Sequence, residues 1–295
     1  MNGVEATVIV PTSIDRGPLL QYSVSSALAQ TVQALEVFII GDGVQEVTRE
    51  AAHALARQDS RVRFFDHPKG SRRGETYRHQ ALQEARGAIV CYLCDRDLWL
   101  PDHVATMREL LTHADFGTTL PLDVRVDGTI GTPMTSHLDL GRADDRQRVL
   151  RERMGFQLSV VGHTLDMYRR LPYGWRTTPE GVFTDAYMWW QFLEDPACRA
   201  RSTFYPTVIY FARGGHPGLS TGERLTELAL WSSRMQDQRS LVACLRDAYG
   251  TAVKQKGSLD RRLRLPLLVR SFTPAELFRG VIRKVSSRGG RRPAP

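Results

Sequence analysis

The chain has 295 residues, of which 42% are hydrophobic and 24% are charged. That length suits one large α/β domain or two fused lobes, and the composition excludes wholesale disorder and a fibrous architecture. The net charge is +8, but residues 251–295 carry twelve Lys or Arg against two acids, which leaves −2 on residues 1–250. A nucleic-acid-binding domain is expected to carry its positive stripe on the fold itself, so we predict no nucleic-acid partner.

The cysteines and the hydropathy pattern bear on the cellular compartment. The four cysteines, Cys91, Cys94, Cys198 and Cys244, are too few and too scattered to indicate a disulfide framework or a zinc site. We interpret them as small buried residues in a reducing compartment. Residues 4–11 are typical of a core strand rather than a signal segment, and no apolar run approaches about 18 residues. We therefore predict a cytoplasmic protein, with peripheral attachment at the inner face of the membrane as an alternative.

The first half of the chain alternates between strand and helix patterns. Short apolar or β-branched runs predict strands over 6–11, 35–40, 62–65, 88–94 and 116–120. Amphipathic stretches predict helices over 18–31, 46–58, 75–85 and 103–112. This βαβ series predicts an α/β fold with a Rossmann-like, mostly parallel central sheet covered by helices. Ligands of such sheets bind at the carboxyl ends of the strands.

Beyond residue 120 the pattern becomes less regular. A hairpin is predicted around 126–128, aromatic-rich segments occur at 173–175 and 187–190, and helical periodicity returns over 221–245.

Polar residues follow the predicted strands. Asp42, after the second strand, can accept hydrogen bonds from the N–H groups of a nucleotide base, although an Asp between two glycines is also an ordinary turn residue. The loop 69–74, together with Arg78, offers cations and a close backbone approach to a phosphate; the alternative is a solvated basic turn.

The cluster Asp95-Arg96-Asp97 directly follows the apolar run 88–94. Mg²⁺ and Mn²⁺ take oxygen ligands and leave positions for substrate phosphates. A bound cation would offset the charge that grows on a leaving diphosphate. The cluster therefore predicts a divalent metal site, with a surface turn containing an internal ion pair as the alternative.

Several segments in a fixed order carry a family resemblance. They are Val8-Ile-Val-Pro-Thr12, Ser26-Ala-Leu-Ala-Gln-Thr31, Glu36-Val-Phe-Ile-Ile-Gly-Asp-Gly43, Glu84-Ala-Arg-Gly87 and Leu93-Cys-Asp-Arg-Asp-Leu-Trp-Leu-Pro-Asp102. Together they resemble the family 2 glycosyltransferases of the GT-A fold over roughly the first 115 residues. The resemblance implies a donor half over 1–120 and an acceptor-binding half of the same domain over 121–250, and the charge distribution adds a basic tail over 251–295.

The resemblance also implies the site. We expect the nucleotide-sugar to be bound by Pro11, Thr12, Asp42, Arg73, Gly74, Arg78, Asp95 and Arg96. The segment 168–185 is similar to the family's acceptor side, in which Asp185 matches the position of the catalytic base. A helix N-cap is the structural alternative for Asp185, and Glu180 is the reserve candidate for the base.

Two departures from the family pattern concern the acids. Gly41 replaces the first acid of the second-strand motif, and Cys94 and Arg96 stand where the family commonly has the two acids of its DxD motif. Asp95 and Asp97 remain, shifted by one residue. We predict Mn²⁺ or Mg²⁺ bound by Asp95, Asp97 and His216, with a phosphate contact or a structural role as the alternatives for His216. Arg96 could itself supply positive charge to the diphosphate. His163 is interpreted as structural or acceptor-lining.

The basic tail contains an amphipathic helix pattern. Thr273, a following proline and Glu276 give an N-terminal capping signal, after which 277–285 separates apolar from basic residues. Such a helix can bind an anionic lipid surface through 273–285, or dock on the protein's own core or on a second subunit.

Taken together, the sequence predicts an inverting glycosyltransferase. It would move a sugar from a nucleotide-diphosphate donor, for which UDP is favoured, to a hydroxyl of a glycan, lipid-linked or small-molecule acceptor. Cys94 and Arg96 motivate the alternative of a catalytically silent relative that binds a nucleotide or a glycan without turnover.

Overall fold

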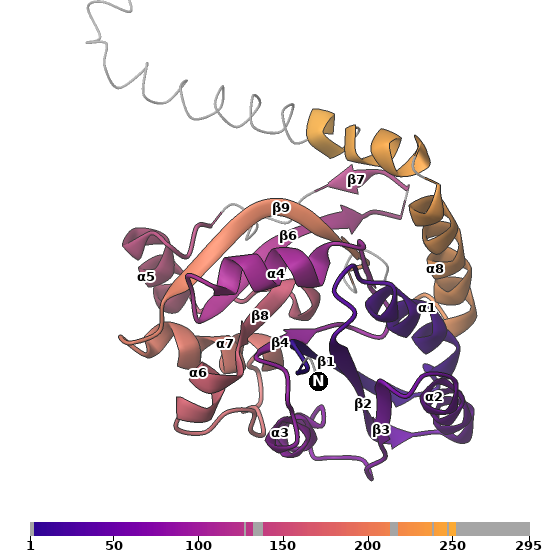
Figure 1. Cartoon of the computed structure of the whole chain (residues 1–295), viewed down its shortest axis with the longest axis horizontal. Coiled ribbons are helices and arrows are strands. Elements are labelled where there is room, and N and C mark those ends of the chain that lie inside the picture. The colour runs from indigo at the N-terminus through magenta and orange to yellow at the C-terminus, as the bar shows by residue number, and fades with distance from the viewer. Residues whose placement is uncertain are drawn as a thin grey trace, which may run out of the picture. The chain divides into compact units, whose positions relative to one another are not determined.

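The computed structural model describes residues 3–126, 128–131, 138–212, 218–237, 239–246 and 248–251. Residues Met1–Ala248 form one compact unit. Its first half alternates four strands with three helices (Figure 1): β1 (Ala6–Ile14), α1 (Gly17–Leu28), β2 (Leu35–Val44), α2 (Glu46–Gln58), β3 (Val62–Phe65), α3 (Glu75–Gln83) and β4 (Ile89–Tyr92). The predicted strand and helix order of this half is confirmed.

The first two strands run further than the sequence predicts. β1 and β2 stay in parallel register from Ala6↔Leu35 to Ser13↔Asp42, so Thr12 and Asp42 lie within strands and not after them. Beyond Ile9, β1 has no β4 partner. Pro11, which lacks a backbone N–H, is therefore tolerated there as on an edge strand.

The second half contains shorter and less regular elements. They are β5 (Leu98–Trp99), α4 (His103–Leu111), β6 (Phe116–Val124), β7 (Ile130–Gly131), α5 (Ala143–Arg151), β8 (Val161–Thr164), α6 (Leu165–Arg170), α7 (Thr184–Glu194), β9 (Ala200–Tyr210) and α8 (Thr221–Gln236). The pairing of β6 with β7 confirms the predicted hairpin. β8 and β9 were not predicted, because β8 contains only four residues and β9 has polar residues near its start and an internal proline.

The strands form one mixed sheet in the order β3-β2-β1-β4-β8-β6-β9-β5. The long pairs β1–β2 and β6–β9 and the pairs of β1 with β4 and β2 with β3 are parallel, whereas the short strand β8 is antiparallel to both β4 and β6. The sheet is therefore mostly parallel, as predicted. The carboxyl ends of β1, β2 and β4 consequently lie at the same edge.

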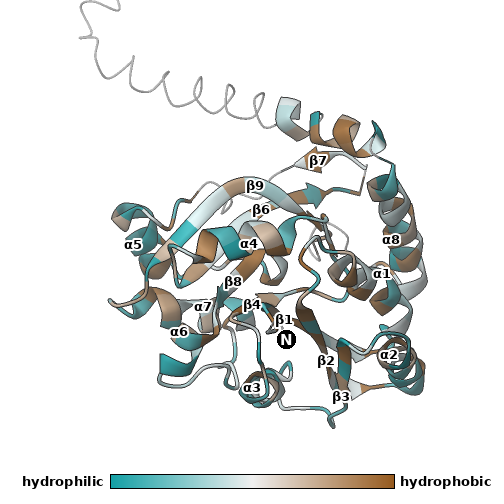
Figure 2. Cartoon of the chain, viewed as in Figure 1, coloured by the Kyte–Doolittle hydropathy of each residue, from teal (hydrophilic) through white to brown (hydrophobic). Residues whose placement is uncertain are grey.

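Apolar strands and amphipathic helices explain this arrangement. In Figure 2 most of β1 is hydrophobic, whereas α2 and α5 carry many hydrophilic residues. Helix α4 packs on β6 and β9, and α8 packs on α1. Within the described ranges, no helix is both long enough and apolar enough to cross a bilayer.

An aromatic cluster joins the second half to β4. The ring of Tyr92 lies 5.6 Å from that of Trp175 and 5.3 Å from that of Trp189, and the two tryptophans are 5.3 Å apart. Burying a large aromatic side chain contributes about 2 kcal/mol, and aromatic pairs add roughly 1 kcal/mol. This packing brings the first turn of α7 close to the carboxyl end of β4.

Candidate functional site

A cavity of about 510 Å³ lies at the carboxyl ends of β1, β2 and β4, which is the edge where the sequence predicts the ligand. Eight of the predicted site residues line it: Pro11, Thr12, Asp42, Arg73, Arg78, Asp95, Arg96 and Asp185. We call this cavity the donor pocket. Six Lys or Arg residues and three Asp residues are among its lining residues, so it carries a net positive charge suited to a polyanion.

Asp42 holds the loop 69–74 against the pocket. Its carboxylate accepts from the Lys69 ammonium at 2.6 Å and from the Gly70 amide at 2.6 Å. Gly74, which precedes α3, has φ +66°, and a Cβ there would lie 2.9 Å from the Cβ of Asp42. Only glycine combines that backbone conformation with that close approach.

The guanidinium of Arg78, on α3, is buried and only partly hydrogen-bonded. The residue is 5% exposed, and its charged group lies 4.6 Å from the ring centroid of Trp175. Nη2 donates to the carbonyl of Arg73 at 2.9 Å, whereas the buried Nε and Nη1 have no hydrogen-bond partner within the described chain. Buried charged donors without acceptors are costly, so this group is suited to receive an anionic oxygen from a ligand.

Asp95 is paired with groups of the protein. Its Oδ1 lies 3.2 Å from Nη1 of Arg16, and its Oδ2 accepts from the Thr12 hydroxyl at 3.0 Å. The two side chains of the ion pair are 15% and 7% exposed. Both carboxylate oxygens therefore have partners, one of them a cation.

Asp97 lies behind the pocket and not on its wall. It is fully buried, and its two oxygens accept from the Ser159 hydroxyl at 2.5 Å and from the Phe211 amide at 3.2 Å. Burial raises the pKa of Asp97 to about 6. Ser159 also accepts from the Cys94 amide at 2.9 Å. Asp97 thus connects the end of β4 to the segments after β9 and before β8.

These acids do not fit a divalent cation. Asp95 is shared with Arg16, Asp97 does not reach the pocket, and between them Arg96 donates from Nε to the carbonyl of Phe211 at 3.2 Å. The third predicted ligand, His216, lies outside the described residues. In the part of the chain that is described, no group of three or more His, Cys, Asp or Glu is placed to hold a metal ion.

Asp185 also lines the pocket, where its carboxylate lies beside Arg78. It is the second residue of α7, whose N-cap is Phe183 and not Asp185 as the structural alternative supposed. Thr184, the first residue of the helix, is buried and its hydroxyl lies 3.5 Å from the Glu75 carboxylate. The surrounding protein desolvates the Asp185 carboxyl and raises its pKa, against the effect of the Arg78 guanidinium 3.9 Å away. A raised pKa makes the carboxylate a better proton acceptor.

The other two candidates lie elsewhere. Glu180 is exposed and does not line the pocket. His163 is buried in the core, where its Nε2 lies 2.7 Å from the Tyr92 hydroxyl and its Nδ1 lies 3.0 Å from the Thr164 carbonyl. The structural interpretation of His163 agrees with this position.

Sequence reasoning did not select Arg16, Glu75 or Ser159. Glu75 is buried and accepts from the backbone amides of Arg73 at 2.9 Å and Thr178 at 3.3 Å, which joins the basic loop to the segment before α7. An acid directly after a glycine at a helix start could have indicated this role. Arg16 and Ser159 carried no such signal, because their partners are distant in sequence.

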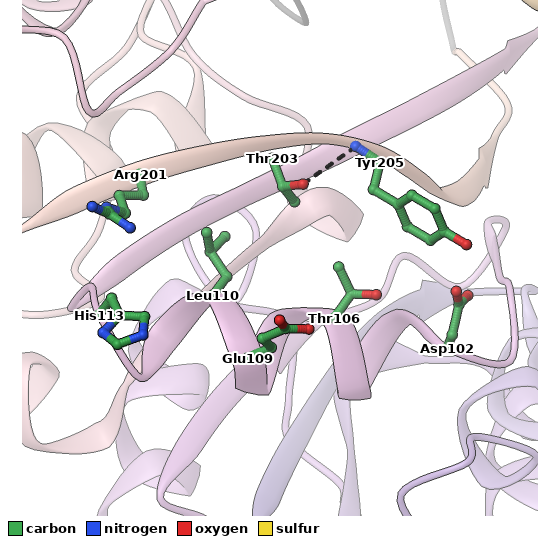
Figure 3. Close-up of a pocket in the computed structure, with 8 residues that line it drawn as sticks. All are labelled: Asp102, Thr106, Glu109, Leu110, His113, Arg201, Thr203 and Tyr205. Carbon is green, nitrogen blue, oxygen red and sulfur yellow. Dashed lines mark hydrogen bonds between the residues drawn. The ribbon is translucent and has the colours of Figure 1, made fainter.

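A second cavity, of about 550 Å³, lies between α4 and β9 (Figure 3). It shares no lining residue with the donor pocket, and we call it the α4–β9 groove. Its charged residues are Asp102, Glu109 and Arg201, with His113 at one end. The neighbouring Asp102 carboxylate raises the pKa of Tyr205.

Similar solved structures define the class as a glycosyltransferase fold of the GT-A type. S. aureus TarS 1–349 in complex with UDP-GlcNAc matches with a TM-score of 0.56 and 13% identity, over 86% of this chain and 75% of that one. A Pyrobaculum calidifontis mannosyltransferase in complex with GDP-Man and Mn²⁺ matches with a TM-score of 0.50 and 16% identity, over 99% of this chain and 82% of that one.

The sequence comparison gives the family. The model described as "Glycosyl transferase family 2" matches residues 7–173, and the chain belongs to this family. A curated relative, the GalNAc(5)-diNAcBac-PP-undecaprenol beta-1,3-glucosyltransferase of Campylobacter jejuni, is 26% identical over 103 residues, which are 35% of this chain. The match spans 33% of that relative, and a longer TarS chain is covered over 43% of its length.

Proposed function

We propose that the protein is an inverting glycosyltransferase that moves a sugar from a nucleotide-diphosphate donor to an acceptor hydroxyl. The observation that carries the proposal is one pocket that brings a group of cations together with a carboxylate. The cations of loop 69–74 and α3 line the same pocket as Asp185, which lies 3.9 Å from Arg78. A diphosphate suits the cations and a reacting hydroxyl suits the carboxylate.

Asp185 is the proposed base. Its carboxylate takes the proton of the acceptor hydroxyl while the oxygen attacks the anomeric carbon. The bond from that carbon to the donor phosphate breaks, and its electron pair leaves with the nucleoside diphosphate. Attack from the face opposite the leaving group inverts the configuration at the anomeric carbon. The pocket cations stabilise the negative charge of the leaving group.

Donor and acceptor are proposed by analogy. UDP is the favoured nucleotide because the TarS structure contains UDP-GlcNAc, and Asp42 would contact the base. A lipid-linked glycan is the favoured acceptor because the Campylobacter relative is named for an undecaprenol-linked one. Such an acceptor would place the protein at the inner face of the membrane. The basic stretch 273–285, predicted to bind that surface, lies outside the described residues.

The predicted divalent cation enters no step of this mechanism. The mannosyltransferase structure contains Mn²⁺, but the acids of this pocket that are described do not fit such an ion.

A donor screen tests the function. Purified full-length protein is incubated with UDP-, GDP- and TDP-sugars and with lipid-linked and free glycan acceptors, and release of the nucleoside diphosphate and the anomeric configuration of the product are measured. We expect release with at least one donor and an inverted product. Nucleotide binding without turnover of any donor would instead support the silent relative, and a retained configuration would exclude Asp185 as the base of an inverting reaction.

A further inference from the structure

The acids that directly follow β4 are already occupied by protein partners. The Arg16 guanidinium and the Thr12 hydroxyl take the two oxygens of Asp95. Those of Asp97 are taken by a hydroxyl and a backbone amide in the buried core. A divalent cation at this point would have to displace Arg16, and of these two acids only Asp95 lines the pocket.

Cations are more abundant than acids at the same place. Arg16, Arg78 and Arg96 all line the pocket, each from a different segment of the chain. Arg78 is nine-tenths buried or more and has two donors without an acceptor in the described protein. Arg96 is fixed by its bond to the Phe211 carbonyl, and Arg16 is fixed by Asp95. These guanidinium groups are therefore held in place before any ligand enters.

We propose that the guanidinium groups of Arg16, Arg78 and Arg96 neutralise the donor diphosphate in place of a divalent cation. The proposal rests on the proposed function, since it presumes a nucleotide-diphosphate donor. Arginine has a planar group with several donors that matches phosphate oxygens, and its charge is permanent. Positive groups that are already oriented stabilise a leaving diphosphate without a reorganisation step. Donor binding by this protein then needs no added metal.

Calorimetry of the full-length protein with UDP and with GDP tests the proposal, in parallel titrations with EDTA and with Mn²⁺. We expect the better nucleotide to bind with dissociation constants that agree within about twofold in the two buffers. Binding that is tenfold or more tighter with Mn²⁺ would overturn the proposal and leave the proposed function standing. Failure of both nucleotides to bind in either buffer would overturn the two together.

Substitutions then test the arginines themselves. Arg16→Gln and Arg96→Gln are each expected to weaken nucleotide binding in EDTA by about tenfold or more, as the loss of one charge-assisted contact predicts. Arg148→Gln is the matched control, because Arg148 is on α5, its side chain is 48% exposed, and it pairs with Glu152 one helical turn away. Nucleotide affinity equal to that of Arg148→Gln would overturn the assignment of the arginine concerned.

Discussion

The donor pocket and the α4–β9 groove have nearly the same volume, about 510 and 550 Å³, but different chemistry. The donor pocket collects side chains from β1, β2, α3 and α7, from loop 69–74 and from the segments after β1 and β4, and six of its lining residues are cations. The groove is lined by one helix and one strand, and acids and cations nearly balance along it (Figure 3). The volume of a cavity therefore does not identify the binding site here. The site is identified by the strand ends and the charged side chains that converge on one cavity.

The largest expected effect separates the two proposed roles of the donor pocket, proton transfer and nucleotide binding. Asp185→Asn keeps the shape of the side chain but removes the proton acceptor, so kcat should fall by about 10²- to 10⁴-fold. The affinity for the nucleotide should change little, because the cations stay in place. Steady-state kinetics and calorimetry measure the two effects separately.

Glu180→Gln is the matched control for Asp185→Asn. Glu180 is also an acid on the segment before α7, but it is exposed and outside the pocket lining. We expect near-normal turnover. The opposite pattern, in which Glu180→Gln is inactive and Asp185→Asn is active, would transfer the base to Glu180.

The next largest effect concerns the cations that line the donor pocket. Arg78→Gln removes the buried guanidinium whose Nε and Nη1 have no acceptor within the described residues. A charge-assisted hydrogen bond contributes about 1.5–3 kcal/mol, so nucleotide affinity should fall by about ten- to a hundredfold. Arg78→Lys keeps the charge without the planar group and should recover part of the loss. If both variants melt like the wild type and bind nucleotide as tightly, Arg78 does not contact the donor.

The donor pocket also shows which features of the site the sequence could predict. The strands of the first half are mostly apolar, so their order and the edge that carries Asp42 and Asp95 follow from local patterns. The hydrogen-bond partners of Asp42 and Asp95 do not follow from local patterns. Asp97 accepts from Ser159 and Phe211, which are 62 and 114 residues away in sequence, and this pairing turns a predicted metal ligand into a buried connection.

Two further features depend on tertiary structure. β8 and β9 lack a clear alternating pattern and form strands because β6 offers both of its edges for pairing. The cluster of Tyr92, Trp175 and Trp189 brings Asp185 to the pocket, and only the resemblance to a family had indicated its place there. Local periodicity contains no information on such contacts.

A smaller effect concerns how the free energy of unfolding depends on pH through a histidine of α4, the helix that lines the groove. His103 on α4 is buried against Trp99, and burial lowers its pKa to about 3. Burial likewise lowers the pKa of His163 to about 4. The unfolded chain takes up protons at these sites below a pH of about 6.5, whereas the folded protein does not, so the free energy of unfolding falls as the pH drops. At pH 5 each histidine should account for about 2 kcal/mol of that loss.

Denaturant unfolding at pH 7 and pH 5 measures this loss. His103→Gln lowers stability at both values but should reduce the difference between them by about 2 kcal/mol. His113→Gln is the control, because His113 is an exposed residue of the groove just beyond the end of α4. An unchanged pH difference in His103→Gln would mean that His103 is protonated in the folded protein.

The smallest expected effect tests the contrast between the donor pocket and the α4–β9 groove. Glu109→Gln and Tyr205→Phe change exposed side chains of the groove without altering the sheet, and nucleotide affinity should stay within about twofold of the wild type. A tenfold loss in either variant would show that the donor contacts the groove, and the assignment by strand ends and charge would fail. A raised KM for the acceptor with unchanged nucleotide affinity would instead give the two cavities separate roles. The donor would then bind at the strand ends, and part of the acceptor would bind along α4 and β9.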